Sequence, residues 1–174
     1  TVSEWYIGVD LGQAQDPTAI VLLEHAREGT GERDTQNWNP IIRESYNVRH
    51  LERTLGSSYP AITERVLEIA QKLTMQSYGQ RPQLVVDGTG VGRPVVDMLK
   101  RAGIPATMTA VTIHGGEAES YGDGYYRVPK RNLCGRLAVM LQQRELKIAE
   151  ALPLAEVLIR ELLSFKVTIN NRGH

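Results

Sequence analysis

Two short apolar runs in this chain each end in an aspartate that is followed by glycine-containing turns. The first, WYIGVDLG, ends at Asp10, and the second, QLVVDGTG, ends at Asp87. Short apolar runs of this kind are typical of strands buried in the middle of a sheet. When such strands are parallel neighbours, their carboxyl ends meet at one edge of the sheet, where the ligands of open α/β folds bind. The pattern therefore predicts an α/β fold in which the two carboxylates converge.

The rest of the pattern predicts three antiparallel strands followed by strands that alternate with helices. Apolar residues recur every three or four positions in 59–79, the spacing of an amphipathic helix, and a proline and a glycine mark the ends of a second helix at 93–103. The glycine-bearing segments 27–40 and 115–127 are predicted to be loops. The other expected elements are strands at 5–10, 18–25, 41–51, 82–90, 105–114, 147–150 and 166–169 and helices at 128–146 and 152–165. This order predicts a mixed central sheet, with an antiparallel edge beside a parallel centre, flanked by helices.

Length and composition predict one domain covering residues 1–174, with no membrane-spanning segment. Basic and acidic residues are balanced at 20 each, which argues against a protein that coats nucleic acid through bulk charge but allows a local basic patch. No apolar run approaches the roughly 20 residues that a transmembrane helix needs. The single Cys134 can form no internal disulfide, so we expect a reducing cytoplasm, which would be that of the host cell if the protein is viral.

The two aspartates are candidate ligands for a divalent cation. Neither motif contains a basic partner, so neighbouring carboxylates would repel each other unless a cation lay between them. Hard oxygen ligands of this type suit Mg²⁺ or Mn²⁺. The alternative is that each aspartate caps a turn or the start of a helix. Asp16 is a further possible ligand, although Asp-Pro-Thr-Ala is also an ordinary turn sequence, and we favour the turn.

Three segments together resemble the nuclease domain of phage large terminase subunits. The first, YIGVDLGQAQDPTAIVLLE, contains Asp10, and the second, LVVDGTGVGRPVVDMLKRAGI, contains Asp87. The third is YRVPKRNLCGRLAVMLQQRELKIA, a Pro-Lys-Arg entry to a long helix that is followed by a short strand. The three segments are spread over residues 6–149 in the order that this family shows.

The resemblance implies a ribonuclease H-like fold and an endodeoxyribonuclease that cleaves double-stranded DNA during viral genome packaging. In this family Asp10 and Asp87 match the first and second metal-binding acids. A third acid follows in a His-Asp-Asp motif, whereas this sequence ends at NNRGH; His174 and the helix residues Glu156 and Glu161 are poor substitutes. We therefore expect a nuclease-type domain that lacks its C-terminal end, with weak binding of a single metal ion and little cleavage.

Two-metal hydrolysis requires one carboxylate that bridges two ions about 3.5–4 Å apart. We assign bridging to Asp10, because its strand is expected to be the most central, and the binding of one ion to Asp87. The family's ATPase motor domain is also absent from this sequence, which contains no phosphate-loop motif. By resemblance, the expected partners are double-stranded DNA, such a motor domain, and the portal and small terminase proteins.

Five basic side chains are candidates for contacting a DNA backbone: Arg93, Arg127, Lys130, Arg131 and Arg136. Lys130 and Arg131 are predicted to lie at the start of a helix, where the helix dipole mildly disfavours a cation, so a phosphate-contacting role gains some support. The alternative is that these residues only keep the surface soluble.

Three other functions are compatible with the motifs. An actin-like or sugar-kinase-like ATPase also places an Asp-x-Gly after its first strand, but it needs two such domains and should bind nucleotide. A Holliday-junction-resolvase-like nuclease shares the core fold and should prefer branched DNA. A non-catalytic DNA-docking module should bind a duplex without any divalent metal.

Overall fold

The chain folds around a single mixed sheet of eight strands. The structure is a computed structural model, and it describes residues 1–12, 15–91 and 93–164. The strands are β1 (Val2–Asp10), β2 (Thr18–Arg33), β3 (Pro40–Thr54), β4 (Gln83–Asp87), β5 (Thr107–His114), β6 (Ser120–Gly122), β7 (Tyr125–Pro129) and β8 (Leu146–Ile148). The helices are α1 (Tyr59–Gln76), α2 (Arg93–Arg101), α3 (Lys130–Gln142) and α4 (Ala155–Ser164). The strand predicted at 166–169 and His174 lie outside the described residues.

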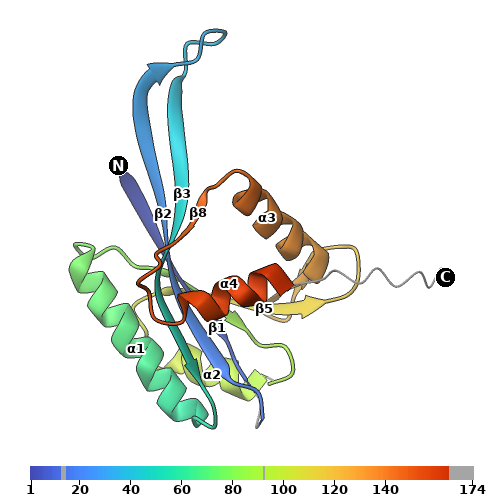
Figure 1. The fold of residues 1–174 in the computed structure, drawn as a ribbon. Helices are drawn as coiled ribbons and strands as arrows, with labels where there is room; N and C mark the ends of the chain where they lie inside the picture. The colour runs from blue at the N-terminus through green and yellow to red at the C-terminus, as the bar shows by residue number, and fades with distance from the viewer. Residues whose placement is uncertain (13–14, 92, 165–174) are drawn as a thin grey trace, which may run out of the picture.

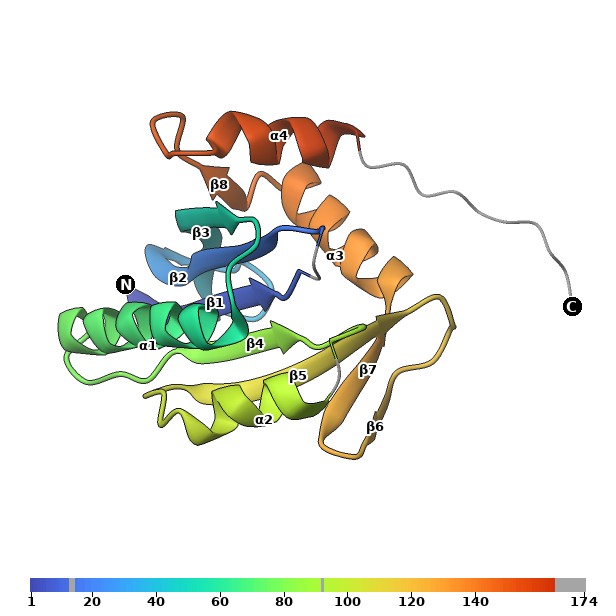
Figure 2. The same ribbon diagram turned by 90° about the horizontal axis from the view of Figure 1, so that it is seen from below.

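Figure 1 shows the ribbon of the chain, and Figure 2 labels every strand of the sheet. The order of strands across the sheet is β6-β7-β5-β4-β1-β2-β3-β8. Strands β1, β2 and β3 form an antiparallel meander, whereas β1, β4, β5 and β7 are mutually parallel. Short edge strands complete the sheet, since β8 pairs parallel to β3 and β6 pairs antiparallel to β7. The predicted mixed sheet, with its antiparallel edge and parallel centre, is confirmed.

Helices cover both faces of the sheet (Figure 2). Alternate residues of a strand point to opposite faces, so Ile7 and Val9 of β1 share one face with Leu84 and Val86 of β4. These four side chains are almost fully buried and form the main core with apolar residues of α1 and α2. The opposite face therefore carries the even-numbered residues of β1, and α3 and α4 lie over that face.

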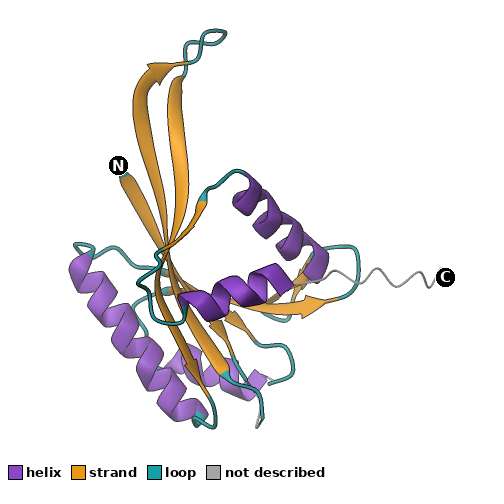
Figure 3. Cartoon of the chain, in the orientation of Figure 1, coloured by secondary structure: helices purple, strands orange, loops and turns teal. Residues whose placement is uncertain are grey.

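The segment predicted as a loop at 27–40 is wrong in part, because most of it continues the first hairpin. Strands β2 and β3 extend well beyond the body of the domain as a two-stranded ribbon, which we call the arm (residues 28–43) (Figures 1 and 3). Arg33 pairs with Pro40 at its tip, where the amide of Asp34 donates to the carbonyl of Asn39 at 2.8 Å. Helices cover neither face of this ribbon, so its residues are mostly exposed and polar.

The loop predicted at 115–127 is also wrong in part, because it contains the hairpin of β6 and β7. Gly122 pairs with Tyr125 across a two-residue turn made by Asp123 and Gly124. Both turn residues have positive φ, 56° for Asp123 and 81° for Gly124, which matches the backbone twist of a tight hairpin. An Asp-Gly pair at this position is a hairpin signal that the sequence carried.

Candidate functional site

Asp10 and Asp87 are register partners in the parallel ladder between β1 and β4. Neighbouring strands lie about 4.8 Å apart, and register partners in a parallel pair point to the same face. Both side chains line one groove on the face covered by α3 and α4. The predicted convergence of the two carboxylates at the carboxyl edge of central strands is therefore observed, while their role as metal ligands stays a prediction.

A tight turn brings the chain back immediately after Asp10. The amide of Gly12 donates to the hydroxyl of Thr18 at 3.1 Å, which ties the end of β1 to the start of β2. A Cβ on Gly12 would stand 2.1 Å from the carbonyl oxygen of Asp16, so only glycine fits here. Asp16 itself is exposed within this turn, in agreement with the turn that its sequence predicts.

Thr89 fixes the orientation of Asp87. Thr89 was not among the site residues predicted from the sequence. The amide and the hydroxyl of Thr89 both donate to Oδ1 of Asp87, at 2.8 and 2.5 Å. The same hydroxyl accepts from the amide of Ile113 at 2.8 Å, so β5 holds Thr89 in place. An aspartate followed two residues later by threonine is a recognised turn pattern, and that pattern was the available signal.

The surroundings of Asp10 at the carboxyl edge disfavour its ionised form. Its pKa is raised above the usual value, first by burial against the surrounding protein, then by the negative charge of Asp87, and then by that of Asp16. Part of Asp10 is exposed to solvent, and the part that lines the groove is next to apolar side chains. Burial on this side is the largest cause of the raised pKa. Among the ion pairs of the described residues, none involves Asp10 or Asp87.

The groove beside the two acids is long and mostly apolar, with a volume of about 640 Å³. Its floor is the sheet face and its far wall is α4. Its apolar lining comes from Val9, Ala19, Ile20, Val21, Leu51, Val85, Val111, Ile113, Val128, Leu133, Leu154, Val157 and Leu158. The groove gives the carboxyl edge a sheltered side.

Acidic residues of α4 do not complete a metal cluster. Glu161 lines the same groove as the aspartates, but its Oε1 pairs with Nη1 of Arg53 at 2.9 Å, and Glu156 lies on another surface of the helix. Within the described ranges, no group of three histidine, cysteine, aspartate or glutamate side chains has a geometry that would hold a metal ion.

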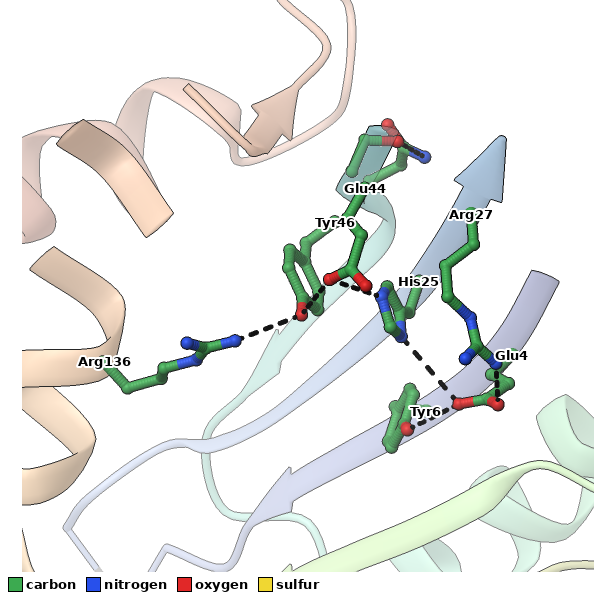
Figure 4. A network of polar contacts seen from close by, with 9 residues as sticks. Glu4, Tyr6, His25, Arg27, Glu44, Tyr46 and Arg136 are labelled. Atoms are coloured by element: carbon green, nitrogen blue, oxygen red, sulfur yellow. Dashed lines mark hydrogen bonds and ion pairs between the residues drawn. The ribbon is translucent and has the colours of Figure 1, made fainter. Parts of the chain in front are cut away.

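Arg136 lies at the end of the sheet face that is far from the two aspartates. Its Nη2 donates to the hydroxyl of Tyr46 at 3.4 Å, and Tyr46 stacks on His25 with ring centroids 4.4 Å apart (Figure 4). Nε2 of His25 contacts Glu44 at 3.4 Å, and Nδ1 contacts Glu4 at 3.8 Å. Glu4 precedes Asp10 by six residues in β1, or about 20 Å of strand. This network ties α3 to the meander.

Three of the remaining basic candidates occur in ion pairs at or near the other edge of the sheet. Arg93 and Arg127 both contact the carboxylate of Asp123. Arg131 pairs with Glu117 at 3.1 Å. Lys130 and Arg131 begin α3 after Pro129, and no side chain caps that helix start, so the predicted position of both cations is confirmed. DNA contact by any of these side chains stays a prediction.

Comparison with known proteins relates the chain to others through its fold. No protein-family model matches the chain, and no curated protein matches it. A Human cytomegalovirus terminase nuclease domain, described as manganese-soaked and inhibitor-bound, superposes with a TM-score of 0.57 at 12% sequence identity, covering 92% of this chain and 74% of that one. A Thermus thermophilus RuvC structure matches with a TM-score of 0.32 at 14% identity, covering 62% of this chain and 60% of that one.

The first of these similarities defines the class of fold. Together with the mixed sheet and its flanking helices, it confirms the predicted ribonuclease H-like α/β fold. At 12% identity the similarity extends to the fold and not to a particular phage protein. In the described part of the chain, no helix has the length and apolarity needed to cross a membrane.

Proposed function

We propose that the chain is a metal-dependent nuclease domain that hydrolyses phosphodiester bonds of double-stranded DNA. The observation that carries the proposal is the in-register placement of Asp10 and Asp87 on adjacent parallel strands. Support also comes from the fold, which resembles that of a terminase nuclease domain described as manganese-soaked.

The residues at the carboxyl edge fit a divalent cation. Asp10 and Asp87 are neighbouring carboxylates without an ion-pair partner among the described residues. Burial raises the pKa of Asp10 most, and the negative charges of Asp87 and Asp16 raise it further. Oxygen ligands with this charge suit Mg²⁺ or Mn²⁺. A bound ion of this type supplies Lewis-acid polarisation of the phosphate and lowers the pKa of a bound water.

The chain's own residues have distinct tasks in this proposal. Asp10 lies on β1, which has strands on both sides, so it is the carboxylate that we assign to bridging in a two-metal arrangement. Asp87 would hold one ion, and the two hydrogen bonds from Thr89 keep its Oδ1 in a fixed direction. The groove wall beside the acids excludes water from one side of the reaction. With these two carboxylates as the acids that the described residues bring to the carboxyl edge, we expect weak binding of one ion and little cleavage.

We place this nuclease in viral DNA packaging, as part of a terminase large subunit. The support is the order of the three terminase-like segments in the sequence together with the fold of the terminase neighbour. In that setting the partners would be duplex DNA, an ATPase motor domain, and the portal and small terminase proteins.

Calorimetric titration with MnCl₂ tests the metal site. Wild type should take up manganese, whereas Asp10→Asn should abolish uptake because it removes the charge of the shared ligand. Asp16→Asn should leave uptake largely intact, because Asp16 lies in the turn and acts on Asp10 only through its charge. Asp97→Asn in α2, outside the groove, is the matched control.

The same variants should be assayed for cleavage of linear duplex DNA in manganese. Equal manganese uptake by wild type and Asp10→Asn would refute the assignment of the site. Cleavage that survives in Asp10→Asn would refute the proposed role of this residue in hydrolysis.

A further inference from the structure

A second, smaller pocket lies beside the turn between β6 and β7, across the end of β4 from the two aspartates. We call it the arginine pocket. It has a volume of about 200 Å³ and is lined by Gly88, Arg93, Thr112, Asp123, Tyr125 and Arg127. Thr112 of β5 points to the opposite face from Val111 and Ile113, which line the groove of the aspartates. The pocket and the groove therefore open on the two sides of one sheet edge.

Two guanidinium groups converge on one oxygen atom in this pocket. Nη2 of Arg93 and Nη2 of Arg127 each lie 3.2 Å from Oδ2 of Asp123. All three side chains are substantially exposed, so the pairs are surface interactions that each stabilise the fold only slightly. Their geometry is informative, because arginine guanidinium groups that bind a carboxylate can bind a phosphate in the same way.

The backbone of the hairpin builds this geometry. The two-residue turn with positive φ fixes the place of Asp123. Gly122 leaves room for Arg127 next to it, because a Cβ there would stand 2.9 Å from Nη1 of Arg127 and would displace that side chain from its present position. The absence of a side chain at Gly122 lets Arg127 lie across β6 and reach the turn. Arg93 approaches the same turn from the first residue of α2.

A third cation lies at the same turn. Nζ of Lys100 is 5.8 Å from the centroid of the Tyr125 ring and 3.6 Å from the position that a Cβ on Gly124 would occupy. In the two ion pairs of the pocket, two guanidinium groups share the one carboxylate of Asp123. An anionic ligand would add the second negative charge to this pair of cations.

The arginine pocket is also joined directly to the candidate metal site. Gly88, which lines the pocket, follows Asp87 in the chain, and its amide donates to the carbonyl of Val111 at 2.9 Å. A Cβ on Gly88 would stand 3.2 Å from Cε1 of Tyr125, so the pocket wall packs closely against the end of β4. A nucleic-acid strand that crosses this edge of the sheet would meet both sites.

We propose that the arginine pocket binds a non-scissile phosphate of the DNA backbone, and that Asp123 occupies the phosphate position when DNA is absent. This inference rests on the proposed nuclease function. Asp123 acts as an internal competitor, because its carboxylate holds the two guanidinium groups at the positions where a phosphate oxygen would bind. DNA binding then exchanges one anion for another, and the arginines remain in place.

Duplex binding by fluorescence anisotropy in EDTA tests the proposal without catalysis. Arg93→Ala combined with Arg127→Ala should weaken binding about tenfold at low salt, because two charge-assisted contacts to one phosphate are lost. The slope of log Kobs against log salt concentration should become less negative by about 1, as expected for one phosphate. The matched control is Arg81→Ala, an exposed arginine that precedes the opposite end of β4.

Asp123→Asn should have the opposite effect and tighten duplex binding several-fold, because it removes the competing charge. Asparagine is well tolerated at positive φ, so the turn is kept. A merely structural salt bridge would predict weaker or unchanged binding for all three substitutions. The proposal is overturned if the double variant binds like Arg81→Ala, or if Asp123→Asn leaves duplex binding unchanged or weakens it.

Two further measurements separate the possible causes of failure. Calorimetry with inorganic phosphate tests whether the pocket binds the free anion. If the double variant loses phosphate binding but keeps the duplex affinity of wild type, the assignment to DNA is overturned. Manganese uptake by the double variant should equal that of wild type. If the double variant takes up manganese normally and its duplex binding is unchanged, only the phosphate role of the arginine pocket is rejected. If Asp10→Asn takes up as much manganese as wild type, the proposed nuclease function is rejected.

Discussion

Replacing Thr89 with valine removes one hydroxyl from the link between β4 and β5 and nearly preserves the shape of the side chain. That hydroxyl donates to Oδ1 of Asp87 at 2.5 Å and accepts from the amide of Ile113 at 2.8 Å. Each such bond contributes about 0.5–1.5 kcal/mol net, and the exposure of Thr89 places both in the lower half of that range, so we expect a loss of about 1–2 kcal/mol. In a domain of this size the melting temperature should fall by about 2–8 °C.

The same substitution should weaken manganese binding. Asp87 keeps the hydrogen bond from the amide of Thr89 but loses the one from the hydroxyl, so its carboxylate is less well oriented. Loss of a group that orients a metal ligand commonly costs about tenfold in metal affinity or more. Because the ligand itself is retained, uptake should be weakened and not abolished.

Thr89→Ser is the control, because serine keeps the hydroxyl and both hydrogen bonds. Thermal melts and manganese titrations should therefore place the serine variant close to wild type and the valine variant apart from it. If the valine and serine variants coincide in both measurements, the hydroxyl does not hold Asp87, and the reasoning fails.

Two more predictions concern the turn at the end of β1. Asp10→Asn should raise the melting temperature in EDTA at pH 7, because the raised pKa of Asp10 means that its ionised form destabilises the fold. This gain in melting temperature should shrink as the pH falls and Asp10 becomes protonated, and it should vanish below about 3.8. An equal gain at every pH would contradict this cause. Gly12→Ala should cost about 1–3 kcal/mol in urea unfolding, because its Cβ would overlap the carbonyl of Asp16. Gly29→Ala should be tolerated, because a Cβ on Gly29 would meet no atom within 4 Å. If both alanine variants lose a similar free energy of unfolding, the clash at Gly12 is refuted.

The central strands and the pairing of the acids were predictable because burial leaves a pattern in the sequence. The interior of β4 (84–86) is apolar, since the strand has strands on both sides and helices on both faces. Helix α1 shows the three-to-four spacing of a helix with one buried face. The position of each aspartate at the end of such a strand was enough to place Asp10 and Asp87 at one edge. The two acids lie side by side because β1 and β4 are parallel neighbours in the sheet.

The arm was missed for the opposite reason. A strand pattern arises when one face is buried and the other is not, and both faces of residues 28–43 meet solvent. Main-chain pairing holds most of this ribbon, with a few side-chain hydrogen bonds such as that from the Thr30 hydroxyl to the carbonyl of Ile41 at 3.1 Å. Main-chain pairing leaves no trace in side-chain composition. The hairpin of β6 and β7 did carry a signal, the Asp-Gly turn, which is easily read as one more flexible glycine segment.

The partners of the site residues were harder to predict than the residues themselves. Arg93 and Arg127 were candidates on charge alone, but their common contact with Asp123 depends on a hairpin that was not expected. Arg136 belongs to the same helix as Arg131, yet it faces Tyr46 at the far end of the sheet face. One-dimensional charge patterns cannot separate these cases, because the separation is set by the direction of α3 across the sheet.

The register between β1 and β4 also bears on how such a protein can diverge. Main-chain hydrogen bonds set the spacing of Asp10 and Asp87, and the buried side chains of Ile7, Val9, Leu84 and Val86 hold the register of the two strands. Apolar replacements of similar size at these positions can therefore accumulate while the two acids stay opposite each other. A one-residue insertion within either strand would be far more damaging, because it would turn one acid to the other side of the sheet.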